Sequence, residues 1–164
     1  MNRRKIPFIL FLLFCAMVLS LGCGGGGGTS ANPDPRLEMV DLINAERSSH
    51  GLASLTHNLA LSQVAQAHAD DMIARNFFDH TNPDSHDFVW RVQNAGITFS
   101  LLAENIAAGY HSMADTHTEF MNSPSHRDNI LNSSVQQVGI GYAWGKSTSL
   151  YGQGLYVVEL FMKP

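Results

Sequence analysis

The first 28 residues form segments that have no place in a packed core, so they confine the folded domain to the rest of the chain. Three basic residues, at positions 3–5, precede the apolar run 6–21, which ends at Gly22. A basic start, an apolar middle and a small residue at the end are the layout of an export signal. We therefore expect residues 1–22 to be a signal peptide, with an uncleaved membrane anchor as the alternative.

Cys23 makes this interpretation more specific. The segment 19–23 resembles a bacterial lipobox, in which the cysteine is acylated and becomes the mature N-terminus, with Ser20 at the position where leucine is usual. Five glycines follow directly, and such a run is flexible and packs nothing. We expect Cys23 to be a lipid anchor that makes the membrane a partner, and residues 23–35 to be a tether and linker.

Cleavage before Cys23 would change the composition of the folded part. The formal charge would fall from -4 to -7, because the signal carries three basic residues and no acidic ones. Cys15 would be lost and Cys23 used for lipid, which excludes a disulfide scaffold and a four-cysteine zinc site. The acidic balance gives no footprint for nucleic acid. We expect one packed domain over residues 36–164, as a monomer.

Helix signals dominate the first two thirds of this domain. Asp34 suits an N-cap, Pro35 a first helical position and Gly51 the end of that helix. Apolar spacing predicts three further helices, over residues 58–75, 87–94 and 112–122. A short helix then restarts, capped either by Ser123 with Pro124 or by Ser125 with Asp128.

The hydrophobic period changes to two near the C-terminus. Residues 138–144 alternate large side chains with Gly139 and Gly141, which predicts a strand with a bare face that another element approaches closely. Residues 155–162 form a second apolar strand, interrupted by Glu159, after a loop over residues 146–154. Helices followed by strands predict an α+β fold with a mostly antiparallel sheet.

Most of the eight histidines fit structural roles. His68 and His117 lie on apolar helical faces, which favours buried core positions over ligand positions. Four others fit turns or surface loops: His50, His57, His86 and His111. The sequence has no HExxH zinc-protease helix and no G-x-S-x-G nucleophile turn, and no cysteine nucleophile would remain after export.

Three short segments suggest chemistry. FFDHT, residues 77–81, places His80 just after a helix and beside two aromatic residues. AENIA, residues 103–107, sets Glu104 inside a small apolar stretch. SPSHRDNIL, residues 123–131, places His126 in a first helical turn, where the helix dipole favours the neutral imidazole that accepts a proton or binds a metal.

Together with NAER at residues 44–47 and the VGIGYAW strand, these segments resemble the bacterial branch of the CAP superfamily. This superfamily comprises the cysteine-rich secretory, antigen 5 and pathogenesis-related proteins, and the resemblance covers residues 36–162. It implies a three-layer α-β-α sandwich with a small, mostly antiparallel central sheet. It also implies a cleft lined by two histidines and two glutamates: His80, Glu104 and His126 match three of these positions, and Ser123 stands at the fourth.

The resemblance implies a divalent metal, zinc being the first candidate, and no organic cofactor. His80, His126 and Glu104 could hold the ion with an open position, or Glu104 could instead orient one imidazole. Glu159 suits a strand edge or a paired position, with a position reaching the cleft as the alternative.

The N-terminal segment favours an exported cell-envelope lipoprotein that faces the periplasm or the exterior. The resemblance implies that its domain binds a small extracellular lipid, glycan or peptide. A hydrolase is an alternative, because a histidine–glutamate pair can serve as general base and orienter; His80, Glu104 and His126 are then the catalytic candidates. In a third hypothesis these residues form a buried hydrogen-bond network that fixes the cleft, and a partner binds elsewhere.

Overall fold

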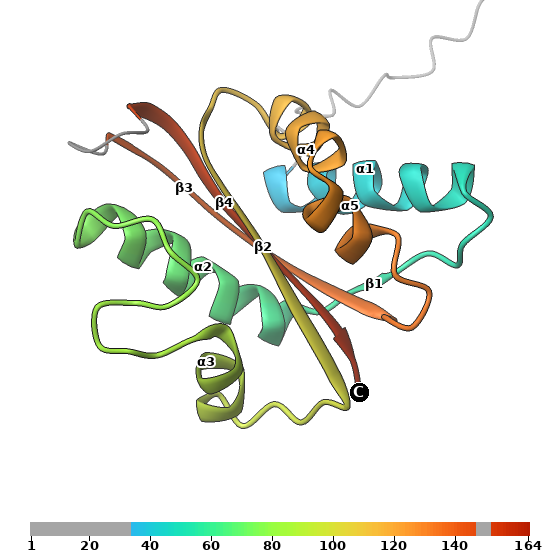
Figure 1. Ribbon diagram of the computed structural model, residues 1–164, viewed down its shortest axis with the longest axis horizontal. Coiled ribbons are helices and arrows are strands. Elements are labelled where there is room, and N and C mark those ends of the chain that lie inside the picture. The colour runs from blue at the N-terminus through green and yellow to red at the C-terminus, as the bar shows by residue number, and fades with distance from the viewer. Residues whose placement is uncertain (1–33, 147–151) are drawn as a thin grey trace, which may run out of the picture. The chain divides into compact units, whose positions relative to one another are not determined.

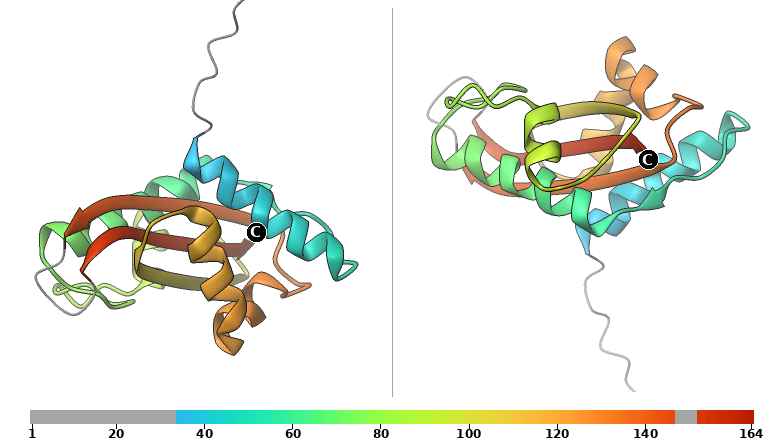
Figure 2. Two further views of the ribbon diagram at one scale, coloured as in Figure 1. Left: turned by 90° about the horizontal axis from the view of Figure 1, so that it is seen from above. Right: turned by 90° about the horizontal axis from the view of Figure 1, so that it is seen from below.

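The computed structural model describes residues 34–146 and 152–164, which form a four-stranded sheet between two layers of helices (Figures 1 and 2). The strand order is β1-β3-β4-β2, with β1 spanning Thr56–His57, β2 Leu101–Tyr110, β3 Gln137–Lys146 and β4 Gln153–Lys163. The short β1–β3 pair is parallel and the two long pairs are antiparallel. The α+β class and the predicted sandwich are confirmed. The expected signal peptide, the Cys23 anchor and residues 147–151 lie outside the described residues.

Five helices cover the two faces of this sheet within the described ranges. One face carries α1 (Pro35–Ser49), α4 (Met113–Asn122) and α5 (Pro124–Ile130); the other carries α2 (Leu59–Ala74) and α3 (Phe88–Asn94). Four helices begin at a side chain that accepts a hydrogen bond from a backbone N–H group: Asp34, Asn58, Asp87 and Ser112. In the described ranges, no helix has the length and apolar character needed to cross a membrane.

Helix α5 settles the choice between its two expected N-caps. Pro124 is its first residue and Ser123 holds the cap position, so the alternative cap at Ser125 is wrong. The Ser123 side chain makes no capping hydrogen bond and instead faces the Ser125 hydroxyl at 3.4 Å. The helix therefore begins because proline suits its first turn, with no help from a side-chain cap.

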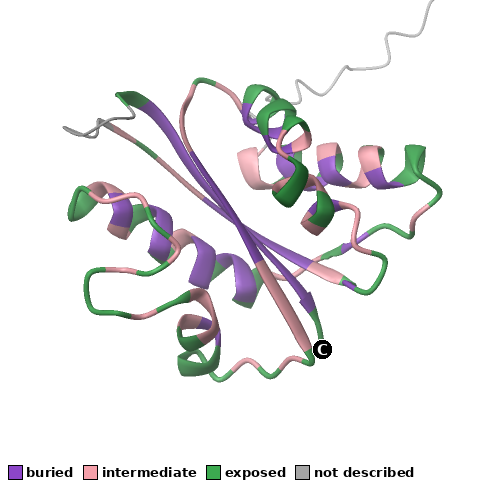
Figure 3. Ribbon diagram, viewed as in Figure 1, coloured by how far each residue is buried: buried purple, intermediate pink, exposed green. Residues whose placement is uncertain are grey.

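Two hydrophobic clusters, one on each face of the sheet, form the core. Strand β4 is shared by both, and Figure 3 shows that it is buried along most of its length. Its position between β3 and β2 explains why residues 155–162 are almost continuously apolar: both of its faces are covered by helices.

Strand β2 was not among the expected elements. The segment LLAENIAAGY has no clear alternation, since small alanines occupy both of its faces. It becomes a strand because it pairs with β4 from Leu101 to Tyr110, with one irregularity near Gly109. Pairing partners far away in the sequence leave no local signal, so tertiary context determines this strand.

The bare face of β3 lies against α2, as the two glycines predict. A Cβ atom at Gly139 would lie 2.5 Å from the Leu61 carbonyl carbon, and one at Gly141 would overlap the Ala65 backbone. Side chains of α2 also bond the β3 backbone, with Ser62 Oγ accepting from the Ile140 N–H at 2.9 Å. Gln66 pairs with both backbone groups of Tyr142, at 3.2 and 2.6 Å.

The NAER motif has a structural role. Asn44 pairs with both backbone groups of Leu55, at 2.7 and 3.1 Å. Arg47 is buried and donates to three carbonyl oxygens, at 2.8, 2.7 and 2.9 Å: those of Ala53, Ile130 and Asn132. These bonds tie α1 to the following loop and to the end of α5, so the motif holds the helix that carries His126.

Replacing Gly141 with alanine tests the close approach of α2. The added methyl group would overlap the α2 backbone, and relieving that overlap should lower the free energy of unfolding by about 1–3 kcal/mol. Gly51→Ala is the matched control, because its Cβ would meet nothing within 4 Å and only its positive φ of 70° is unfavourable. Urea denaturation measures both changes; a loss at Gly141 no larger than that at Gly51 would contradict the packing.

Candidate functional site

A buried carboxylate, that of Glu104 on β2, is the centre of the candidate site. Its side chain is 0% exposed, and its two oxygens have different partners. Oε1 accepts a hydrogen bond from Nδ1 of His80 at 2.8 Å, and Oε2 accepts one from Nη2 of Arg91 at 2.6 Å. Because a buried charge is costly without a partner, Arg91 makes this position tolerable.

Arg91 is a site residue that the sequence did not indicate. It lies on α3 with its side chain only 9% exposed. Besides Glu104, its guanidinium donates to the carbonyl oxygens of His80 at 2.8 Å and His86 at 3.1 Å. Arg91 therefore fixes the loop that carries His80, and no local pattern in the α3 sequence pairs it with Glu104 on a later strand.

His80 lies in the loop between α2 and α3 with its ring partly exposed. The hydrogen bond from Nδ1 to the Glu104 carboxylate raises the pKa of His80 above its ordinary value, and burial opposes this shift. Because Nδ1 is engaged, Nε2 is the ring nitrogen left to meet a ligand.

His126 lies in the first turn of α5, and its ring packs edge-on against Phe120 with centroids 5.1 Å apart. Burial lowers the pKa of His126, and the positive charge of His80 lowers it further. Both effects favour the neutral imidazole, which is the form that the sequence predicts.

The side-chain amides of Asn105 and Asn129 form a hydrogen-bond network that includes the backbone of His126. Asn105, the residue after Glu104, donates to the His126 carbonyl oxygen at 3.1 Å and to Glu159 Oε2 at 2.9 Å. Asn129 of α5 donates to Asn105 Oδ1 at 2.8 Å. The strand-edge interpretation of Glu159 is wrong, because β4 is a central strand. The paired position is correct: this fully buried carboxyl accepts a hydrogen bond from the Asn105 amide.

A cavity of about 190 Å³ opens beside His126 along β2, the edge strand of the sheet. Most of its wall is apolar, formed by Phe78, Ile106, Ala107, Ala108 and Phe120. Its polar groups are His126, Tyr110 and Glu119. Burial and the neighbouring Glu119, which is hydrogen-bonded to Tyr110, raise the pKa of the Tyr110 hydroxyl.

Glu119 is an acidic residue that lines this cavity, and it was not among the site residues expected from the sequence. The fourth family position corresponds to Ser123, but Glu119 lies four residues earlier, and residues four apart share one face of a helix. Its charge acts on His126, whose pKa it raises against the effect of burial. Its position one helical turn before Ser123 is the sequence signal that could have indicated it.

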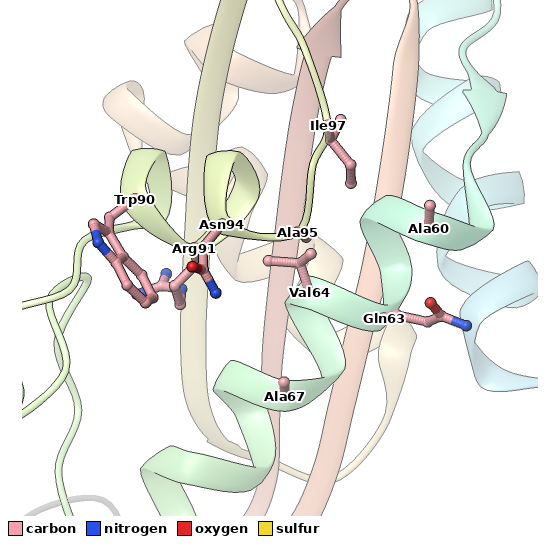
Figure 4. A pocket seen from close by; sticks show the side chains of 9 residues that line it. All are labelled: Ala60, Gln63, Val64, Ala67, Trp90, Arg91, Asn94, Ala95 and Ile97. Carbon is pink, nitrogen blue, oxygen red and sulfur yellow. The ribbon is translucent and has the colours of Figure 1, made fainter.

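Two further histidines have structural positions. His68 and His117 are buried core residues, as expected. Over residues 34–146 and 152–164, no three His, Cys, Asp or Glu side chains gather closely enough to hold a metal ion. A larger hollow, of about 370 Å³, lies between α2 and α3 and contains none of the three expected site residues (Figure 4).

This α-β-α sandwich agrees with the fold that the CAP resemblance implies. The chain belongs to the CAP family: the family model, described as the cysteine-rich secretory protein family, matches residues 40–161. It is 36% identical over 116 residues to the uncharacterized protein YkwD of Bacillus subtilis, covering 71% of this chain and 44% of YkwD. It therefore spans less than half of that relative.

Solved structures share the same fold. An extracellular protein containing an SCP domain from Bacillus anthracis superposes with a TM-score of 0.70 at 28% identity, over 79% of this chain and 40% of that chain. An outer surface protein from Borrelia burgdorferi superposes with a TM-score of 0.65 at 24% identity, over 77% of this chain and 90% of that chain. The second likeness concerns the fold alone.

The buried Glu159 predicts a pH-dependent stability. Burial raises its pKa to about 8 from the ordinary 4.5, so the folded state keeps a proton that the unfolded chain releases. The contribution of this group to stability should therefore fall as pH rises from about 4.5 to about 8. Glu159→Gln keeps an acceptor for Asn105 without a charge, and should gain a few kcal/mol over the wild type at pH 8 but little at pH 4.5.

Urea denaturation at the two pH values measures this difference. Glu38→Gln is the control, because Glu38 is an exposed acid on α1 and its replacement removes a surface charge without changing the core. A Glu159→Gln variant whose gain in stability is the same at both pH values would contradict a protonated Glu159.

Proposed function

We propose that this protein is an exported cell-envelope lipoprotein whose CAP domain binds a divalent metal ion through His80 and His126 and a small extracellular ligand in the cavity beside them. The observation that carries the proposal is the Glu104 carboxylate, which holds Nδ1 of His80 at 2.8 Å. A carboxylate that fixes one ring nitrogen orients the other toward a metal.

The chemistry of the donor set fits such an ion. His126 is held neutral by burial, and a neutral imidazole is the form that ligates. Both oxygens of Glu104 are engaged, so this residue acts as the orienting group of the site in preference to a third ligand. Two imidazoles leave coordination positions open, where a bound ion would polarise an oxygen atom of a ligand.

The cavity indicates the kind of ligand. Its wall is mostly apolar, with Tyr110, Glu119 and His126 as the polar groups, which suits an amphipathic molecule. A volume of about 190 Å³ is smaller than a pocket for a whole drug-sized ligand, so it takes one part of the ligand. Among lipids, glycans and peptides, those with an apolar group fit best.

The location of the protein is proposed from its N-terminus and its relatives. Residues 1–23 have the layout of a lipoprotein signal, and the similar SCP-domain structure is described as that of an extracellular protein. Both observations support a domain that works outside the cytoplasm, held at a membrane by Cys23.

Zinc titration by calorimetry tests the metal site. The purified protein should bind one zinc ion, and the variant carrying both His80→Ala and His126→Ala should give no heat above buffer. Glu104→Gln, checked for folding, should bind zinc about 10- to 100-fold more weakly, because it loses the charge that orients His80. The matched control carries His50→Ala and His111→Ala, two exposed histidines outside the cavity, and should bind as the wild type does.

Equal heats for the wild type and the His80/His126 variant would refute the metal site. A purely structural role would give a different pair of results. Zinc would not bind, and the triple alanine variant at His80, Glu104 and His126 would lose stability but still bind its partner.

Replacing Cys23 with serine tests the anchor. Acyl chains add about 0.8 kcal/mol of membrane affinity per buried methylene, so the wild type should partition into detergent and Cys23→Ser into water. Detergent phase separation of cell lysates measures this, with mass spectrometry of the N-terminus as a second readout. Cys15→Ser is the matched control and should partition as the wild type does; an unacylated Cys23 would refute the anchor.

A further inference from the structure

The hollow between α2 and α3 is separate from the cleft, and the fold gives no reason for it. It measures about 370 Å³, and its nine lining side chains are shown in Figure 4. We propose that this α2–α3 pocket binds an uncharged aromatic molecule of one or two rings that carries an oxygen acceptor. Six lining residues determine its shape and its polar groups: Ala60, Val64, Ala67, Trp90, Arg91 and Asn94.

The shape of the pocket comes from small residues on α2. Ala60, Val64 and Ala67 are spaced by four and three residues, so they share one face of the helix. This face turns toward Trp90 and Asn94 of α3, and the small side chains leave the space between the helices open (Figure 4). The volume lies in the range of small-molecule sites, near its lower end, which suits one or two rings.

Trp90 gives the pocket its preference for a flat ring. Its side chain is 42% exposed, and the apolar anchor of α3 is Val92, which is 0% exposed. The indole stacks on His86 with centroids 3.4 Å apart and planes 3° from parallel. Its orientation is therefore set before any ligand arrives, and a second ring can stack on its uncovered face without a cost for ordering the side chain.

The charges around the pocket favour an uncharged ligand. Arg91 is the one charged residue of the lining, and the buried Glu104 carboxylate already neutralises it at 2.6 Å. Arg91 Nε is buried and has no hydrogen-bond partner within the described residues. The amide of Asn94 also lines the pocket and offers a further donor. A neutral ring with an oxygen acceptor matches these groups better than a carboxylate or an ammonium ion.

The pocket is connected to the loop that carries His80. Trp90 stacks on His86, and Arg91 donates to the carbonyl oxygens of both His86 and His80. A ligand that shifts Trp90 or Arg91 must therefore disturb the hydrogen bonds that position His80. We expect a bound aromatic ligand to change the surroundings of the His80 imidazole, although His80 itself does not line the pocket.

Acetophenone is a suitable probe, because it combines one uncharged ring with a carbonyl acceptor. In a titration followed by NMR, it should shift the backbone amide signals of Val64, Ala67 and Asn94 and the indole N–H signal of Trp90. Cyclohexyl methyl ketone should bind about fivefold more weakly, because it keeps the carbonyl and loses ring stacking. Benzoate should bind more weakly still, and at saturation with acetophenone the His80 ring signals should move.

Ala67→Leu tests the pocket itself. Leucine fills the hollow and is nearly as good a helix former as alanine, so the fold should persist while the acetophenone shifts disappear. Trp90→Leu should weaken binding about fivefold. Ala114→Leu, at an exposed position on α4, is the matched control and should leave the titration unchanged. The His80/His126 double alanine variant should also bind acetophenone, so failure of the metal site would not affect this result.

Several results would overturn the proposal. Shifts that persist in Ala67→Leu, or that centre on Trp144, the other exposed tryptophan, would place the probe elsewhere. Benzoate binding as tightly as acetophenone would refute the preference for an uncharged ring. A His80 signal that stays unchanged at saturation would refute the connection to the cleft.

Discussion

The Glu104 carboxylate is the constraint around which this domain is arranged. A buried negative charge must be paired, and here the pairing comes from two elements that are distant from β2 in the chain: Arg91 from α3 and His80 from the preceding loop. Satisfying one charge thus fixes a helix, a loop and a strand at once. The same pairing leaves Nε2 of His80 facing outward, so stability and chemistry depend on the same contacts.

Strand β2 holds both histidines by using its two faces. Successive residues of a strand point to opposite sides of the sheet, so Glu104 faces α3 and Asn105 faces α5. Glu104 binds the ring of His80, and Asn105 binds the backbone of His126. Because β2 is an edge strand, both contacts lie at the border of the sheet. The dipeptide Glu104-Asn105 therefore determines the geometry of the site more than either histidine does.

The sequence predicted those parts of the fold that rest on local chemistry. The start of α1 was visible because Asp34 and Pro35 act within one turn, and Gly139 and Gly141 showed the close packing of β3. Strand β2 was missed because its stability comes from pairing with β4, which leaves no local trace. Arg91 and Glu119 were missed for a related reason: their roles depend on which elements meet. His80, Glu104 and His126 stood out through their local surroundings, but only the family resemblance assigned them to one cleft, because their spacing alone does not show that they converge.

The bonds from α2 to β3 have a consequence for how the domain meets other chains. An open strand edge offers unpaired N–H and C=O groups to which another polypeptide can add. Beyond its short pairing with β1, β3 would have such an edge, but Ser62 already binds the N–H group of Ile140 and Gln66 binds both backbone groups of Tyr142. Helix α2 thereby blocks strand addition at this border of the sheet. The protection needs no disulfide, which suits a domain whose folded part contains no cysteine.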